Sequence, residues 1–254
     1  MLVPRRAWPD DRFPHWAVAA LRAAGARVSE TGRRADVALL PALRPAATPH
    51  VRAGRVIGLI DVPARPGDER LEGVELVATS QALAWEGARV VRPAVKHGVR
   101  PHVSPGEDVL RIVSVGPLHW SAGHEHAVVA AARLGAGVEL RIAGDGPARE
   151  PILFAAFDLG IESSVIVGSG DELAADVVVV PAVEDRAWPG LLQALAGGVP
   201  VVASDLPTAR ELGAPVLVPP RDPAALAAAI GQHGPEPPRP ELTDLEACGR
   251  ALLA

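Results

Sequence analysis

Tyrosine is absent from this 254-residue sequence, Met1 is the only methionine, and Cys248 is the only cysteine. A single cysteine excludes an intrachain disulfide framework and a zinc site built from several cysteines. We therefore predict a protein of a reducing compartment, and the expected location is the cytoplasm.

Long apolar runs and clusters of positive charge are missing as well. The most apolar stretches are about six to eight residues long, far below the ~18 residues of a transmembrane helix. Prolines and acids interrupt the sequence soon after Arg5 and Arg6, so we expect no secretory signal. The net charge is −5 and no block is dense in lysine and arginine. The sequence thus predicts no transmembrane segment and argues against nucleic-acid binding.

Hydrophobic residues make up 48% of the chain, which is ample for a buried core. In the second half, short β-branched runs end at Gly, Pro or Asp, and helix-like segments separate them. Such runs are typical of strands buried on both faces of a parallel sheet. The expected strands are 109–116, 138–144, 164–170, 175–182, 200–205 and 214–220. Alternation of this kind predicts an α/β domain with a doubly wound parallel sheet.

The first half repeats the pattern less fully. A helix is expected within 14–28, and strands are expected at 35–42, 55–62, 74–80 and 89–95. Proline, glycine and charge replace the apolar pattern at 102–109, with a hinge expected at 104–108. We predict a smaller Rossmann-like domain at 1–104, a larger one at 105–234, and a connector at 235–254 whose final helix crosses back to the first domain.

Candidate binding residues follow the predicted strands, because ligands of such sheets bind beyond the carboxyl ends of the strands. Gly116 follows the first strand of the second domain, and Gly144 and Gly146 follow the next. Glycines there let a backbone approach a phosphate at a helix N-terminus. The same glycines also suit a tight strand-to-helix turn, and both interpretations stay open.

A second candidate set is acidic and amidic. Glu184 and Asp185 follow the strand at 175–182, and Gln193 lies one to two turns into the next helix. Acid and amide side chains suit sugars, whose hydroxyls both donate and accept hydrogen bonds. The alternative is that the two acids favour the N-terminus of a helix and that Gln193 is a surface residue.

Three histidines lie close together in the sequence at His119, His124 and His126. His124 and His126 are two positions apart, so on a helix they point to different sides, and we predict no metal site. His119 and Trp120 follow the first strand, where a ring either stacks on a base or sugar or is partly buried.

The second half resembles a known family. The segments "LRIVSVGPLHWSAGHEHAVVAAARL", "ELRIAGDGPAREPILFAAFDLGI", "ADVVVVPAVED", "LLQALAGGVPVVASD" and "VLVPPRDPAALAAAI" occur in the order and spacing of the carboxyl-terminal domain of retaining GT-B glycosyltransferases of family four, the glycosyl transferases group 1. The first half looks like a shortened acceptor domain of that family. The resemblance implies a GT-B-like fold of two Rossmann-like domains, a nucleotide-sugar as donor substrate, and no cofactor.

The resemblance transfers the functional positions only in part. Where the family grips the donor diphosphate with arginine and lysine, this sequence has Pro117 and Ala122. Where the family has two glutamates eight residues apart, this sequence has Asp185 and Gln193. The resemblance therefore implies catalytic roles for Asp185 and Glu184. The implied donor-binding residues are Gly116, Gly144, Gly146 and Gln193.

Three functions remain open at this point. The first is an active transferase that moves a sugar with retention to an unknown acceptor. The second is a degenerate homologue that acts as a partner or stabiliser of an active transferase. An unrelated nucleotide-binding α/β module ranks last, because an ordered set of motifs rarely arises by chance.

Overall fold

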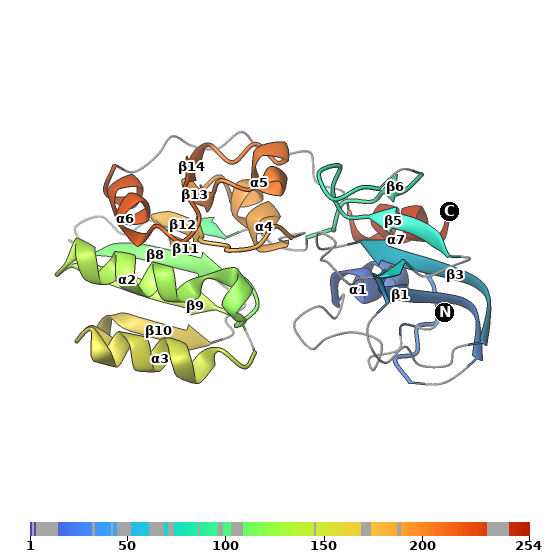
Figure 1. The fold of residues 1–254 in the computed structure, drawn as a ribbon, viewed down its shortest axis with the longest axis horizontal. Coiled ribbons are helices and arrows are strands. Elements are labelled where there is room, and N and C mark those ends of the chain that lie inside the picture. Colours follow the sequence, from blue (N-terminus) through green and yellow to red (C-terminus); the bar gives the residue numbers. More distant parts are fainter. Residues whose placement is uncertain are drawn as a thin grey trace. The chain divides into compact units, whose positions relative to one another are not determined.

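A computed structural model describes residues 1, 3, 15–31, 34–41, 43–44, 52–60, 69–70, 74–85, 87–95, 99–102, 109–144, 146–168, 174–186, 189–232 and 244–254. The chain forms two compact units: unit 1 comprises Met1–Lys96 with Leu242–Ala254, and unit 2 comprises His97–Glu241 (Figure 1). The predicted hinge at 104–108 and the predicted boundary at 234–235 lie outside the described residues.

Unit 1 is built on a four-stranded parallel sheet. Its strand order is β1 (Arg34–Pro41), β3 (Arg52–Ile60), β5 (Glu75–Ala78) and β6 (Arg89–Val90). A small antiparallel pair, β2 (Leu43–Arg44) and β4 (Glu69–Arg70), belongs to the same unit. The predicted strand at 89–95 shortens to two residues. Pro93 has no N–H for a ladder, and Val91 and Ala94 are instead buried in the core beneath the helices.

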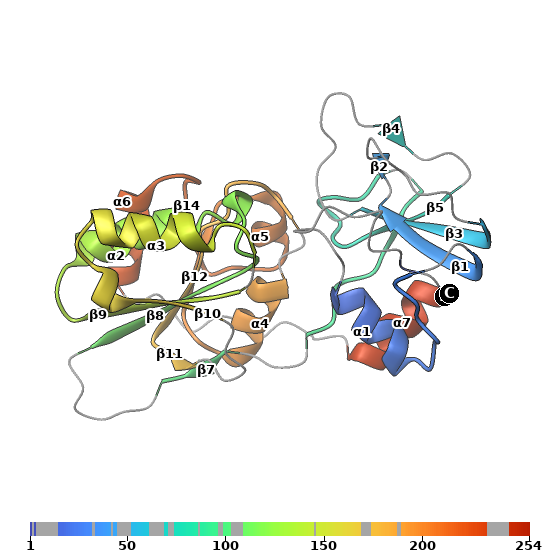
Figure 2. The ribbon, with the colours of Figure 1, turned by 90° about the horizontal axis from the view of Figure 1, so that it is seen from below.

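Two helices from opposite ends of the sequence pack against each other in unit 1. They are α1 (His15–Ala23) and α7 (Leu245–Leu253), which lie side by side in Figure 2. Cys248 and Leu252 of α7 are fully buried with Leu21 of α1. A Cβ at Gly249 would lie 2.1 Å from the carbonyl oxygen of Ala20, so only glycine permits this close approach.

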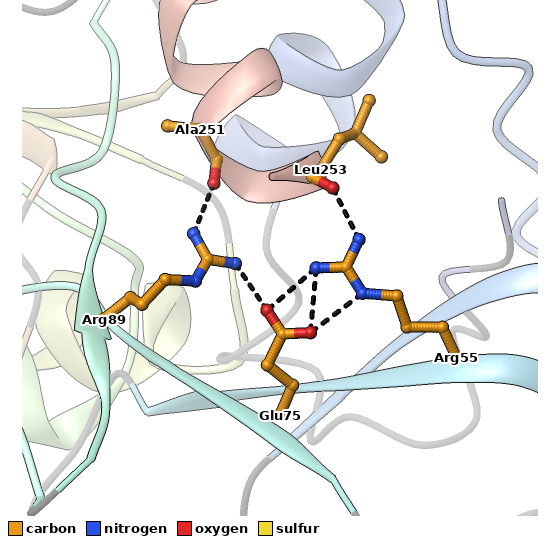
Figure 3. Close-up of polar contacts among 5 residues, drawn as sticks. All are labelled: Arg55, Glu75, Arg89, Ala251 and Leu253. Carbon is orange, nitrogen blue, oxygen red and sulfur yellow. Dashed lines mark hydrogen bonds and ion pairs between the residues drawn. The ribbon is translucent and has the colours of Figure 1, made fainter.

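Two arginines and one glutamate hold the end of α7 on the sheet (Figure 3). Arg55 donates to both oxygens of Glu75 at 2.8 Å, and Arg89 donates to Glu75 Oε1 at 2.8 Å. The same guanidinium groups donate to α7 carbonyls, Arg55 to Leu253 at 2.5 Å and Arg89 to Ala251 at 2.7 Å. The last carbonyls of a helix lack intrahelical partners, so these cations satisfy groups that the helix leaves open.

Unit 2 contains a six-stranded parallel sheet with the order β10–β9–β8–β12–β13–β14. The strands are β8 (Leu110–Val115), β9 (Val138–Ala143), β10 (Val165–Gly168), β12 (Val177–Val180), β13 (Val201–Ser204) and β14 (Val216–Val218). The chain builds outward from β8 through β9 to β10, then returns to place β12 on the other side of β8. The strand order therefore reverses between β8 and β12.

Helices cover both faces of the unit 2 sheet. One face carries α2 (His124–Leu134), α3 (Arg149–Asp158) and α6 (Pro223–Gly231), and the other carries α4 (Pro189–Gly197) and α5 (Pro207–Glu211). Along β12, Val177 and Val179 join the first core, and Val178 and Val180 join the second. Burial on both faces explains why these strands are apolar at every position. Unit 2 thus has the predicted doubly wound α/β architecture.

The predicted strand at 175–182 is divided in the structure. Ala174 and Ala175 form β11, which pairs with β7 (Arg100–Pro101), while β12 pairs with β8. Asp176 separates the two strands, and its carboxylate accepts from the backbone N–H of Arg111 at 2.8 Å. Among the helices that the structure describes, none has both the length and the hydrophobicity of a membrane-spanning helix.

Candidate functional site

Five of the six candidate residues follow strands at the carboxyl edge of the unit 2 sheet, and the sixth, Gln193, lies on α4 (Pro189–Gly197). Gly116 follows β8, Gly144 and Gly146 follow β9, and Glu184 and Asp185 follow β12. Because β8 and β12 are neighbours at the reversal of strand order, the loops that follow them flank the point where doubly wound sheets bind ligands.

The loops after β8 and β9 press closely together. A Cβ at Gly144 would lie 2.1 Å from the carbonyl oxygen of Gly116, and one at Gly146 would lie 2.6 Å from that of Leu118. Gly146 also has a φ of 144°, a conformation that side chains disfavour. Contact between two backbones therefore explains Gly144 and Gly146 without a ligand, as the tight-turn interpretation expects.

A short 3₁₀ helix, η3 (Trp120–Ala122), connects the β8 loop to α2. The Nδ1 atom of His119 caps it by accepting from the backbone N–H of Ser121 at 3.3 Å. Trp120, the first residue of η3, is 45% exposed. Ala122 is 1% exposed and belongs to the core between the sheet and α4. The family resemblance places a lysine at this position, and the Cβ atom of such a lysine would lie inside that core.

The loops that flank the reversal are also joined to each other. The backbone N–H of Val183 donates to the carbonyl of Ser121 at 2.9 Å. Gly123 has a φ of 68°, and a Cβ there would lie 2.0 Å from the carbonyl oxygen of Pro181. The β8 and β12 loops therefore form one connected backbone framework.

His124 is a structural residue of that framework. It is fully buried, its Nδ1 lies 2.8 Å from the hydroxyl of Ser114, and its Nε2 lies 3.2 Å from the carbonyl of Pro117. Burial lowers the pKa of His124 to about 4, so the ring is neutral near pH 7. Within the described residues, no group of three or more His, Cys, Asp or Glu side chains is arranged to hold a metal ion.

Asp185 interacts with a helix other than the one that follows it. Its carboxylate accepts from the backbone N–H of Thr208 in the first turn of α5, at 3.2 and 3.3 Å. The N-cap residue of α5, Leu206, provides no side-chain bond, so Asp185 fills that role from a distant loop. Burial raises the pKa of Asp185, while the bonds from Thr208 partly oppose that rise.

Three further polar side chains lie near Asp185 in the sequence. Glu184 is half-buried and Arg186 is 6% exposed, so the β12 loop contains a buried cation beside two acids. Gln193 is half-buried on α4, between the buried Leu192 and Ala194, and its backbone carbonyl, not its side chain, accepts from the backbone N–H of Val99 at 3.2 Å. The catalytic and donor-binding roles suggested for these residues stay predictions.

Sequence reasoning missed two residues that shape this edge. Thr208 anchors Asp185, and Ser114 anchors His124. The proline that starts α5 was a visible signal for a helix N-terminus, but its distant acidic cap was not. No periodicity marks Ser114, which is a single polar residue inside an apolar strand.

Solved glycosyltransferases are among the structures that are similar in fold to this chain. Sucrose-phosphate synthase from Thermosynechococcus elongatus has a TM-score of 0.57 at 19% identity, and the match covers 78% of this chain and 63% of that one. A TarM variant from S. aureus, solved with UDP, has a TM-score of 0.56 at 16% identity over 81% of this chain and 48% of that one. HepE of Anabaena in complex with UDP and glucose has a TM-score of 0.58 at 16% identity over 87% and 71%.

These similarities establish the fold as an α/β, GT-B-like one with parallel sheets. The chain spans less than two thirds of the first two of these structures, at 63% and 48% of their lengths. No curated protein matches the sequence. The family model described as Glycosyl transferases group 1 matches residues 110–233, which lie within unit 2, and this part of the chain is therefore a Glycosyl transferases group 1 domain.

Proposed function

We propose that this protein is a glycosyltransferase that moves a sugar from a nucleotide-sugar donor to an acceptor with retention of configuration. The observation that carries the proposal is the reversal of strand order between β8 and β12, flanked by a connected loop framework in a Glycosyl transferases group 1 domain. The crystal structures of HepE and TarM with UDP support a uridine nucleotide as the first donor to test.

We assign different tasks to the two acids of the β12 loop. Asp185 is a positioning residue, because its carboxylate is used to hold Thr208 and thereby fixes the loop against α5. Glu184 is then the carboxylate for the transferred sugar. Arg186 supplies positive charge for the departing diphosphate, a task that such sites need when no metal is present.

The substitutions at the two cation positions favour a second function. Ala122 belongs to the apolar core, and Pro117 has no charge, so neither residue replaces the diphosphate contacts of the family. Each charged hydrogen bond contributes roughly 1.5–3 kcal/mol, so losing two weakens donor binding by about a hundredfold to ten-thousandfold. A degenerate homologue that stabilises another transferase fits such weak binding.

Calorimetric titration with UDP, GDP, ADP and their glucose conjugates separates the two functions. Micromolar binding together with release of nucleoside diphosphate by the unmodified protein would support transfer. In that case Glu184→Gln should abolish turnover, and Asp185→Asn should lower the unfolding temperature, because Asp185 holds the backbone N–H of Thr208.

Weak or absent binding would support the second function, that of a degenerate homologue. Two variants then show whether the weak binding is due to lost contacts with the diphosphate or with the ribose. Pro117→Arg should strengthen UDP binding by about 10- to 100-fold, whereas Gln193→Glu should strengthen it by only about fivefold. Ala122→Lys is left out of the comparison because it would disturb the core. If Gln193→Glu has the larger effect, the defect lies at the ribose and the diphosphate argument is wrong.

A further inference from the structure

Two of the three phenylalanines of the sequence are exposed on one helix. Phe154 and Phe157 of α3 are 69% and 68% exposed, although α3 buries Ile152 and Ala156 against the sheet. Residues three apart lie on the same side of a helix, so the two rings form one surface on the side away from the core. In Figure 1, α3 lies beside β10 at the edge of the unit 2 sheet.

The exposed apolar area of Phe154 and Phe157 is larger than that of single scattered side chains and smaller than that of a standard protein–protein interface. A phenylalanine presents ~200 Å², so the two rings together leave on the order of 270 Å² accessible. Leu159, 41% exposed just after α3, adds to that area. Apolar patches of about 300 Å² on a monomer are often functional, whereas a standard interface buries about 800 Å² per partner. The size therefore fits a single helix or short segment of a partner.

Two acidic side chains bracket the rings along α3. Glu150 and Asp158 lie four residues before and after Phe154, hence on the same side of α3, and are about 12 Å apart along the helix axis. Both are exposed, and neither forms an ion pair within the described part of the chain. The neighbouring Arg149 directs its guanidinium to the carbonyl of Val167 at 2.6 Å.

Charge at both ends decides which occupant fits. Two copies of α3 that meet through their rings would bring acid against acid in either orientation, which disfavours self-association. An anionic lipid surface would repel the same carboxylates. A partner with lysine or arginine on both sides of an apolar stripe would complement them.

We propose that Phe154 and Phe157, bracketed by Glu150 and Asp158, form a docking surface for a protein partner that presents an amphipathic helix with an apolar stripe flanked by basic residues. The two rings are the aromatic anchors that pack against the apolar stripe of the partner helix. The surface lies on α3 and needs no nucleotide, so it goes beyond the proposed function.

The test measures by fluorescence anisotropy how tightly the full chain binds a synthetic amphipathic helix that has a leucine stripe flanked by lysines. Phe154→Ser with Phe157→Ser should weaken binding about tenfold or more. Glu150→Gln with Asp158→Asn should weaken binding at low salt and remove most of its salt dependence. Leu217→Ser is the matched control, because Leu217 is an exposed apolar residue, 37% accessible, on β14 at the opposite edge of the sheet.

Several outcomes would overturn the proposal. Equal binding of a peptide with glutamates in place of the lysines, or no effect of the double Phe substitution, would show that the patch does not select a basic partner. A dimer in analytical ultracentrifugation that the Phe substitutions abolish would assign the surface to a second copy. Binding to phosphatidylserine vesicles through the same rings would assign it to a membrane. UDP titration of the Phe variants should match the unmodified protein, which separates this result from failure of the proposed function.

Discussion

Single glycines decide how closely the loops of unit 2 approach one another. Gly144 faces the carbonyl of Gly116, and any Cβ there meets a backbone atom that cannot swing aside. A glycine at a strand-to-helix turn suggests either a phosphate site or a tight turn, and the sequence does not separate them. The short distances from a Cβ at Gly144 or Gly146 to the facing carbonyl oxygens show that the close approach of the two loops requires glycine at both positions.

Gly144→Ala should lower the free energy of unfolding by about 2–4 kcal/mol, because the new Cβ would lie 2.1 Å from the carbonyl oxygen of Gly116. Gly168→Ala is the matched control, since a Cβ at Gly168 meets nothing within 4 Å. Urea unfolding of both variants measures the difference. Equal effects of the two substitutions would contradict the close approach.

A buried histidine gives unit 2 a dependence on pH. Burial lowers the pKa of His124 to about 4, below its unfolded value of about 6.5, so the unfolded chain binds the extra proton more readily. The stability that this residue contributes is complete above pH 6.5 and is lost as the pH falls toward 4.

We expect the free energy of unfolding to drop by about 2 kcal/mol between pH 7.5 and pH 5.0 on account of His124. His124→Gln should remove that part of the pH dependence, whereas His126→Gln on the same helix should preserve it. Urea unfolding at the two pH values measures both. An unchanged pH dependence in His124→Gln would assign the effect to other groups.

At the scale of elements, the helix α7 is held by polar and apolar contacts at once. The cluster of Arg55, Glu75 and Arg89 joins three strands to the end of α7 (Figure 3). Hydrogen bonds from Arg55 and then Arg89 lower the pKa of Glu75 to about 2. The stabilisation is therefore present above about pH 4.5 and is lost as the pH falls toward 2.

Glu75→Gln should lower the stability of unit 1 by about 1 kcal/mol, a modest value because the carboxylate is 35% exposed and solvent screens the pairs. Glu246→Gln, which breaks the exposed pair with Arg250 on α7, is the control and should change stability by less than about 0.5 kcal/mol. Thermal unfolding at pH 7 compares them. A larger loss of stability in Glu246→Gln than in Glu75→Gln would show that Arg55, Glu75 and Arg89 do not hold the end of α7.

At the scale of the whole molecule, the C-terminal segment folds together with the N-terminal segment in unit 1. Leu242–Ala254 forms part of unit 1, although the 145 residues of unit 2 separate it from Lys96. The core of unit 1 includes Cys248 and Leu252 among its fully buried side chains. Unit 1 is therefore complete only when both segments are present.

Deletion of residues 242–254 should destabilise unit 1 and leave unit 2 folded. Hydrogen exchange followed by mass spectrometry should show faster exchange in β1, β3 and β5, with protection retained in β8, β9 and β12. The reason is that the deletion exposes the apolar surface of α1 and removes the α7 carbonyls that accept from Arg55 and Arg89. Unchanged protection in β3 would mean that α7 contributes little to unit 1.

The α/β class could be predicted from the sequence, and so could the six parallel strands of unit 2 to within a few residues. The glycines and acids that follow these strands were also found from the sequence, and their binding and catalytic roles stay predictions. Those features depend on local apolar runs and on the punctuation between them, which are visible in one dimension. Three features could be seen only in the folded chain. The strand β6 is short, and β11 is separate from β12. Asp185 caps α5 and not the helix that follows it. The tertiary structure also decided that Ala122 is a core residue and that Phe154 and Phe157 are exposed. Each of these depends on contacts between residues far apart in the chain, and an apolar residue has the same letter whether a neighbouring element covers it or not.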